Sequence, residues 1–151
     1  MRIRLFAALL FVSVASVAAA AGNYALYYGR GTPAALEALA RYESVVIDPV
    51  ALGAHAKDDV ALLKSHGCVV YGYLSCFEVA PHVRYQESMT NAGWVIRVGD
   101  DVWHPYGKNF AVDLARPDVQ ARFVELVKSE VVDLGCEGVF MDTLADLDKL
   151  R

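Results

Sequence analysis

The sequence has only one long hydrophobic run, and it lies at the start of the chain. Arg2 and Arg4 precede the apolar segment 5–17, and small residues follow it. A charged start, a short apolar run and small residues are the pattern of a secretory signal peptide. No later stretch approaches the roughly 20 apolar residues that a membrane helix needs. We therefore expect residues 1–21 to be a signal peptide and residues 22–151 to be a secreted or periplasmic chain without stable membrane insertion.

Positive charge is scarce in the chain beyond the signal peptide. The whole chain has 14 lysine and arginine residues against 18 aspartate and glutamate residues. Loss of the two N-terminal arginines leaves 12 basic residues against 18 acidic ones, a net charge of −6 with neutral histidines. Nucleic acid is therefore not an expected partner, because its phosphates attract basic surfaces. A neutral or cationic ligand suits this charge better.

Motifs for phosphate and zinc binding are missing as well. The GRG segment at 29–31, which follows the apolar stretch 23–28, lacks the GxGxxG spacing that binds a dinucleotide phosphate. The histidines show neither HExxH nor another close ligand spacing, so a zinc site is not expected. A nucleophilic Cys76 with His82 or His104 as its base is a weak alternative.

The three cysteines are an odd number for an exported protein. Cys68 and Cys136 each follow a glycine and each stand at the start of an apolar segment, in GCVVYGYL and GCEGVF. If these segments are neighbouring parallel strands, their two sulfurs can form a disulfide. Buried free thiols are the alternative.

Strand-like and helix-like segments alternate after the signal peptide. Thr32 and Pro33 are typical of a helix start. The expected strands are 23–28, 44–49, 68–75 and 137–142, and the expected helices are 33–42, 54–66 and 117–134. This alternation, with strands apolar on both faces, predicts a parallel sheet covered on both sides. Two architectures fit: the first four units of a (β/α)8 TIM-type barrel, or a small doubly wound sheet.

A long irregular segment, 77–109, interrupts the alternation. One short helix is expected near 85–91, and 109–114 reads as a brief extended piece. Loops of this length inside a compact domain are uncommon and often have a function. Its aromatic residues, Trp103 among them, are either anchors of the loop or platforms for a sugar ring.

Three successive strands are followed by a carboxylate. Asp48, Glu78 and Asp142 follow the second, third and fourth expected strands, and Tyr28 follows the first. Both architectures place their functional face at the carboxyl ends of the strands. Each acid alone is readily explained as a helix cap or a solvated loop residue. Their recurrence at one level predicts a shared acidic cleft, which suits glycoside hydrolysis or an oxygen-ligated metal ion.

Five short motifs also resemble a known family. They are YYG at 27–29, VVID at 45–48, GYLSCFE at 72–78, VDLARPDVQ at 112–120 and GVFMDTLAD at 138–146. In their order and spacing they are similar to the endo-alpha-1,4-polygalactosaminidase-like glycoside hydrolases (family 114), which are exported (β/α)8 barrels. One departure is Phe77, which stands where the family usually carries a glycine.

The resemblance implies hydrolysis of alpha-1,4 linkages in galactosamine-rich, partly deacetylated polysaccharide by carboxylate acid/base catalysis, without a cofactor or a metal. The family's catalytic aspartate at the end of strand four corresponds to Asp142. Its catalytic glutamate comes from a later strand and has no counterpart before residue 151. The residues expected to bind substrate are Tyr28, Asp48, Glu78, Trp103 and Asp146.

Residues 22–151 are therefore expected to be a glycoside hydrolase-like domain that comprises about the first half of a barrel. Half a barrel leaves two sheet edges unpaired and the catalytic pair incomplete. The alternative is a non-catalytic carbohydrate-binding or dimerising module, a homodimer that completes its barrel with a second copy.

Overall fold

The computed structural model describes residues 22–81, 86–105 and 107–143. The expected signal peptide and Asp146 lie outside these residues. Among the helices described, none combines the length and the apolar character needed to cross a membrane.

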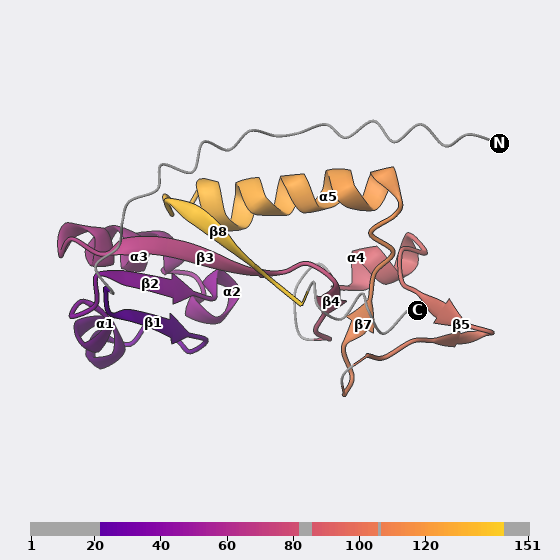
Figure 1. Ribbon diagram of the computed structural model, residues 1–151, viewed down its shortest axis with the longest axis horizontal. Helices are drawn as coiled ribbons and strands as arrows, with labels where there is room; N and C mark the ends of the chain where they lie inside the picture. The colour runs from indigo at the N-terminus through magenta and orange to yellow at the C-terminus, as the bar shows by residue number, and fades with distance from the viewer. Residues whose placement is uncertain (1–21, 82–85, 106, 144–151) are drawn as a thin grey trace.

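Four parallel strands form the central sheet, in the order in which they occur along the chain (Figure 1). Each strand pairs in parallel with its neighbour, and Tyr27, Ile47 and Gly72 are successive partners across the first three strands. The strands are β1 (Tyr24–Tyr27), β2 (Ser44–Ile47), β3 (Val69–Ser75) and β8 (Gly138–Asp142). All four expected strands are confirmed, within one or two residues at each end.

The helices between these strands also follow the sequence pattern. Thr32 caps the first one, because its hydroxyl oxygen accepts a hydrogen bond of 3.3 Å from the amide of Ala35. The expected helix 117–134 begins at Pro117, but its last turn is π-helical. The elements are α1 (Pro33–Leu39), α2 (Pro49–Leu52), α3 (Ala56–Ser65), α5 (Pro117–Val127) and the π-helix η1 (Lys128–Val132).

Within the described residues, helices cover one face of the sheet. On β3, Val70 and Leu74 belong to the two buried apolar clusters under the helices, and Val131 of η1 lies against Gly72 between them. The intervening side chains of β3 point to the other face. The large apolar residues exposed on that face are Tyr24, Leu26, Tyr28, Val69, Tyr71 and Phe140. The expectation of a sheet covered on both sides is therefore wrong for the described residues.

This one-sided arrangement decides between the two expected architectures. A doubly wound sheet reverses its strand order and places helices on both faces. Here the strands follow one another in sequence order and the helices lie on one side, as in a (β/α) barrel. The fold is a partial barrel, and its open face corresponds to the inside of a closed one.

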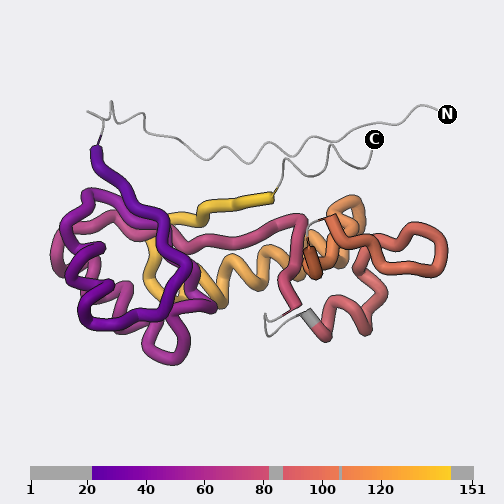
Figure 2. Tube along the Cα trace, turned by 90° about the horizontal axis from the view of Figure 1, so that it is seen from below, coloured from indigo at the N-terminus to yellow at the C-terminus, as the bar shows by residue number. Residues whose placement is uncertain are grey.

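The long segment after β3 is an antiparallel excursion rather than an open loop. Its elements are β4 (Glu78–Val79), α4 (Gln86–Asn91), β5 (Arg97–Val98), β6 (Asp101–Val102) and β7 (Phe110–Ala111). β4 pairs with β7, and β5 pairs with β6. The expected short helix is confirmed. Figure 2 shows this excursion at one end of the elongated molecule, with the parallel sheet and α1 to α3 at the other.

Candidate functional site

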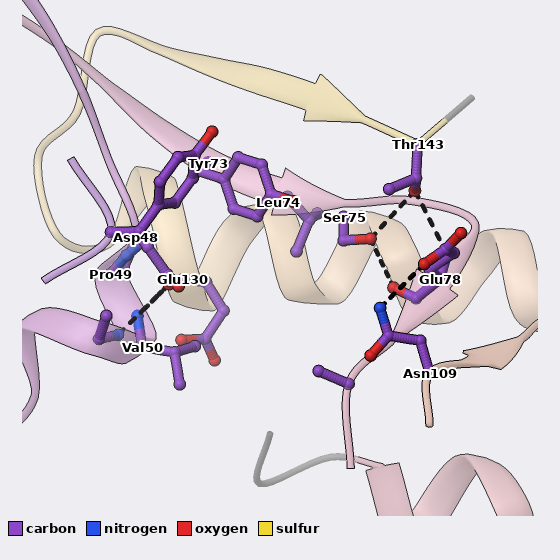
Figure 3. Close-up of a pocket in the computed structure, with 13 residues that line it drawn as sticks. Asp48, Pro49, Val50, Tyr73, Leu74, Ser75, Glu78, Asn109, Glu130 and Thr143 are labelled. Atoms are coloured by element: carbon purple, nitrogen blue, oxygen red, sulfur yellow. Dashed lines mark hydrogen bonds between the residues drawn. The ribbon is translucent and has the colours of Figure 1, made fainter. Parts of the chain in front are cut away.

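A cavity of about 360 Å³ lies at the carboxyl ends of the parallel strands. Three of the predicted site residues, Tyr28, Asp48 and Glu78, line it together. Its other polar lining residues are Tyr73, Ser75, Asn109, Glu130 and Thr143 (Figure 3). The residues that follow different strands thus meet at one place, as the sequence analysis expects from a parallel sheet.

Asp142 stands beside this cavity as the last residue of β8. Its Oδ1 accepts a hydrogen bond of 2.7 Å from the amide of Thr143, and its Oδ2 accepts one of 3.1 Å from the hydroxyl of Tyr73. Both donors belong to residues that line the cavity. The carboxylate therefore has a fixed orientation, which a reacting group requires.

Two tyrosines form the wall next to Asp142. The rings of Tyr28 and Tyr73 meet edge to face with centroids 5.0 Å apart, and Tyr73 also stacks on Phe140. Burial raises the pKa of Tyr73, and the charge and hydrogen bond of Asp142 raise it further. The pKa of Tyr28 is also raised, by burial and then by the charges of Asp142 and Asp48. Both hydroxyls are therefore neutral hydrogen-bond donors at ordinary pH.

Glu78 is the first residue of β4, after the turn that follows β3, and it lines the cavity. The residue is 4% exposed, and its Oε2 accepts a hydrogen bond of 2.9 Å from the side-chain amide of Asn109. The preceding residue, Phe77, is fully buried and its ring packs against Trp103 at a centroid distance of 5.9 Å. The bulky Phe77 side chain therefore points away from the cavity into the excursion.

Trp103 and Asp48 make contacts in the structure that could not be predicted from the sequence alone. Trp103 packs on Phe77 and does not belong to the described lining of the cavity. Asp48 caps the short helix α2, because its Oδ1 accepts hydrogen bonds from the amides of Val50 and Ala51 at 2.9 and 3.3 Å. Asp48 therefore caps a helix and also lines the cavity.

Several cavity residues were missed by the sequence analysis. The alternation along β3 places Tyr73 and Ser75 on the open face, and that signal could have identified them. Glu130 is 5% exposed on η1, where the π-helical turn breaks the helical periodicity. Asn109 comes from the excursion, and nothing local in the sequence marks it.

The cysteines are free thiols. The register of β3 and β8 pairs Tyr71 with Gly138, which offsets Cys68 and Cys136 by one residue. Cys68 instead directs its thiol towards the carbonyl of Leu39 at 3.8 Å. Of the two alternatives left open by the sequence, the structure therefore has the free thiols. Burial raises the pKa of Cys76, which disfavours the nucleophilic thiolate.

In the described part of the chain, no group of three or more histidine, cysteine, aspartate or glutamate residues is arranged to hold a metal ion. What the site does hold is the oriented carboxylate of Asp142, the acidic side chains of Asp48, Glu78 and Glu130, and two neutral tyrosine hydroxyls. Such a set can exchange protons with a substrate oxygen and bind sugar hydroxyls.

No protein-family model and no curated protein sequence matches this chain. Solved structures do match it. The glycoside hydrolase domain of PelA from Pseudomonas aeruginosa has 25% sequence identity and a TM-score of 0.65, over 83% of this chain and 46% of that one. Ega3 from Aspergillus fumigatus, solved in complex with galactosamine, has 16% identity and a TM-score of 0.62, over 84% and 46%.

A third match extends the likeness beyond these two proteins. The maltogenic alpha-amylase AmyB from Thermotoga neapolitana has 11% identity and a TM-score of 0.60, over 85% of this chain and 43% of that one. The chain thus spans less than half the length of these solved structures. The described residues have the fold of the TIM-barrel glycoside hydrolases and form part of such a barrel.

Proposed function

We propose that this chain is part of a secreted or periplasmic glycoside hydrolase that cleaves alpha-1,4-linked, galactosamine-rich polysaccharide. Asp142 is one of its two catalytic carboxylates, and no cofactor takes part. Tyr28, Asp48 and Glu78 bind the sugar. Trp103 and Asp146 complete the proposed substrate-binding set.

The orientation of Asp142 carries this proposal. A carboxylate with a hydrogen-bond donor on each oxygen stands at the end of the fourth strand, beside the cavity that Asp48 and Glu78 line. The ends of barrel strands are where glycosidases of this fold place their reacting groups. Support for an amino-sugar polymer comes from the galactosamine complex of Ega3 and from the acidic balance of the mature chain.

Replacement of the carboxylate tests the proposal. In a full-length version that carries the rest of the barrel, Asp142→Asn keeps the size of the side chain and an acceptor for the Thr143 amide but removes the acid. Release of reducing ends from partly deacetylated polygalactosamine should fall roughly 100-fold to 10,000-fold, the usual range for loss of an acid or base. Asp133→Asn, which changes an exposed acid paired with Lys128, is the matched control. Unchanged turnover in Asp142→Asn would contradict the proposal.

The open face of the sheet favours a second candidate. It exposes tyrosine, leucine and phenylalanine side chains, and large exposed apolar surfaces usually have a partner. A non-catalytic carbohydrate-binding module would cover this face with a second copy, joining β8 of each copy to β1 of the other. Light scattering after gel filtration separates the two candidates. A compact dimer that binds the polysaccharide without cleaving it favours the module, whereas a cleaving monomer excludes it.

A further inference from the structure

Thr143 has an unusual backbone. Its φ is +67°, and it is the one residue other than glycine with positive φ in the described part of the chain. A β-branched residue rarely adopts this left-handed conformation, because its side chain crowds the backbone. Such a conformation persists where surrounding contacts hold it, and it is found preferentially at functional sites. The contacts of Thr143 should therefore show what holds this backbone conformation in place.

The hydroxyl of Thr143 joins the ends of two strands. Its oxygen accepts hydrogen bonds of 3.0 and 3.3 Å from the amides of Phe77 and Glu78, in the turn that follows β3. The hydroxyl itself donates to the carbonyl of Asp142 at 2.7 Å. Ser75 completes the junction, with its hydroxyl 3.0 Å from that of Thr143 and donating to the carbonyl of Glu78 (Figure 3).

The same residue also orients the carboxylate. The amide of Thr143 donates to Oδ1 of Asp142 at 2.7 Å. One residue thus fixes Asp142 through its backbone and holds the Glu78 turn through its side chain. The left-handed φ sets where the side chain of Thr143 points relative to its own amide, which is the donor to Asp142.

We propose that Thr143 is a positioning residue that locks the turn bearing Glu78 to the strand end bearing Asp142. The inference rests on the proposed function for its effect on turnover, but the lock itself is a property of the fold. Loss of the hydroxyl frees the Phe77 and Glu78 amides from their acceptor and lets Glu78 move relative to Asp142.

Two variants isolate the hydroxyl. Thr143→Val keeps the β-branched shape and removes the oxygen, whereas Thr143→Ser keeps the oxygen. In the full chain, Thr143→Val should accelerate hydrogen exchange at the amides of Phe77 and Glu78 by about 10-fold, the value of one hydrogen bond. In the full-length protein it should lower kcat/KM by about 10-fold to 100-fold, because Glu78, which is proposed to bind the sugar, shifts relative to Asp142. Thr143→Ser should restore both. If Thr143→Val does not fold, Thr143→Ala is measured in the same way.

The two readouts separate failure of this inference from failure of the proposed function. Wild-type exchange rates at both amides in Thr143→Val would overturn the lock. Faster exchange with unchanged kcat/KM, in a protein that Asp142→Asn inactivates, would overturn the positioning role. If the full-length wild type cleaves no polysaccharide, the proposed function fails, while faster exchange restored by serine still supports the lock.

Discussion

The hydroxyl of Tyr73 donates a hydrogen bond of 3.1 Å to Oδ2 of Asp142 and thereby links the third and fourth strands across the open face of the sheet. The contact is half-buried, and burial first, then the negative charge of Asp142, oppose ionisation of the phenol and raise its pKa. Tyr73 therefore keeps its proton in the folded protein at a pH where it would lose it in the unfolded chain.

Tyr73→Phe should change the alkaline stability of the protein. Because the folded-state pKa of Tyr73 is raised, its contribution to stability is complete below the unfolded value of about 10 and is lost as the pH rises through the folded value. Removing the hydroxyl removes this titration, so the free energy of unfolding should fall less steeply above about pH 10. Urea unfolding at a series of pH values measures the slope. Tyr42→Phe, at an exposed tyrosine, is the matched control. An identical slope for wild type and Tyr73→Phe contradicts the prediction.

Gly72→Ala should destabilise the protein. A methyl group at this position would lie 2.8 Å from one methyl carbon of Val131 and 3.0 Å from the other. Val131 is 1% exposed, so it has no room to move aside. Overpacking of this kind costs about 1–3 kcal/mol of unfolding free energy.

Gly138→Ala, on the adjacent strand, is the control for Gly72→Ala. Its added methyl would meet only the ring of Tyr71, which is 38% exposed and can shift. Chemical denaturation of the two variants compares them directly. Equal stability of the two would show that η1 does not pack closely on β3.

Much of this fold could be predicted from the sequence, because the strands and long helices carry extended apolar patterns. The four-residue helix α2 and the two-residue strands of the excursion are too short to produce a period. Asp48 illustrates the limit within the site. An acid after a strand is compatible with a cap and with a cleft, and only the fold shows that this one serves α2 and faces the cavity.

The contacts between distant segments could not be predicted from the sequence, for a different reason. The bonds of Thr143 to Phe77 and Glu78 depend on the register of β3 and β8, which no local pattern specifies. The open face was misjudged for a related reason. Strands apolar on both sides indicate two apolar faces, but they do not indicate which segments, if any of those described, cover each face.

Asp118→Asn should change the acid stability. Arg116 donates two hydrogen bonds to Asp118, at 3.1 and 2.7 Å, and these lower the pKa of Asp118 to about 2, with help from the indole N–H of Trp94. A lowered pKa stabilises the fold above the unfolded value of about 3.9 and loses that effect as the pH falls through about 2. The variant should therefore lose less stability between about pH 4 and pH 2.

Salt provides the check on the Asp118 prediction. The ion pair is exposed, so high ionic strength should shrink the difference between wild type and Asp118→Asn. Thermal unfolding at low and high salt, at pH 3 and pH 6, measures the stability difference between wild type and Asp118→Asn under each of the four conditions. A difference that is the same at both pH values contradicts the assignment.

The pairing of Glu78 with Ala111 means that the excursion after β3 leaves the barrel and returns to it at neighbouring points. Its exposed β5–β6 hairpin can change in length without altering the distance between β3 and α5, whereas Val79 and Met89 of the same segment are buried in the cluster that includes residues of α5. The outer part of the excursion can therefore vary while the strand ends that hold Asp142 and Glu78 stay the same.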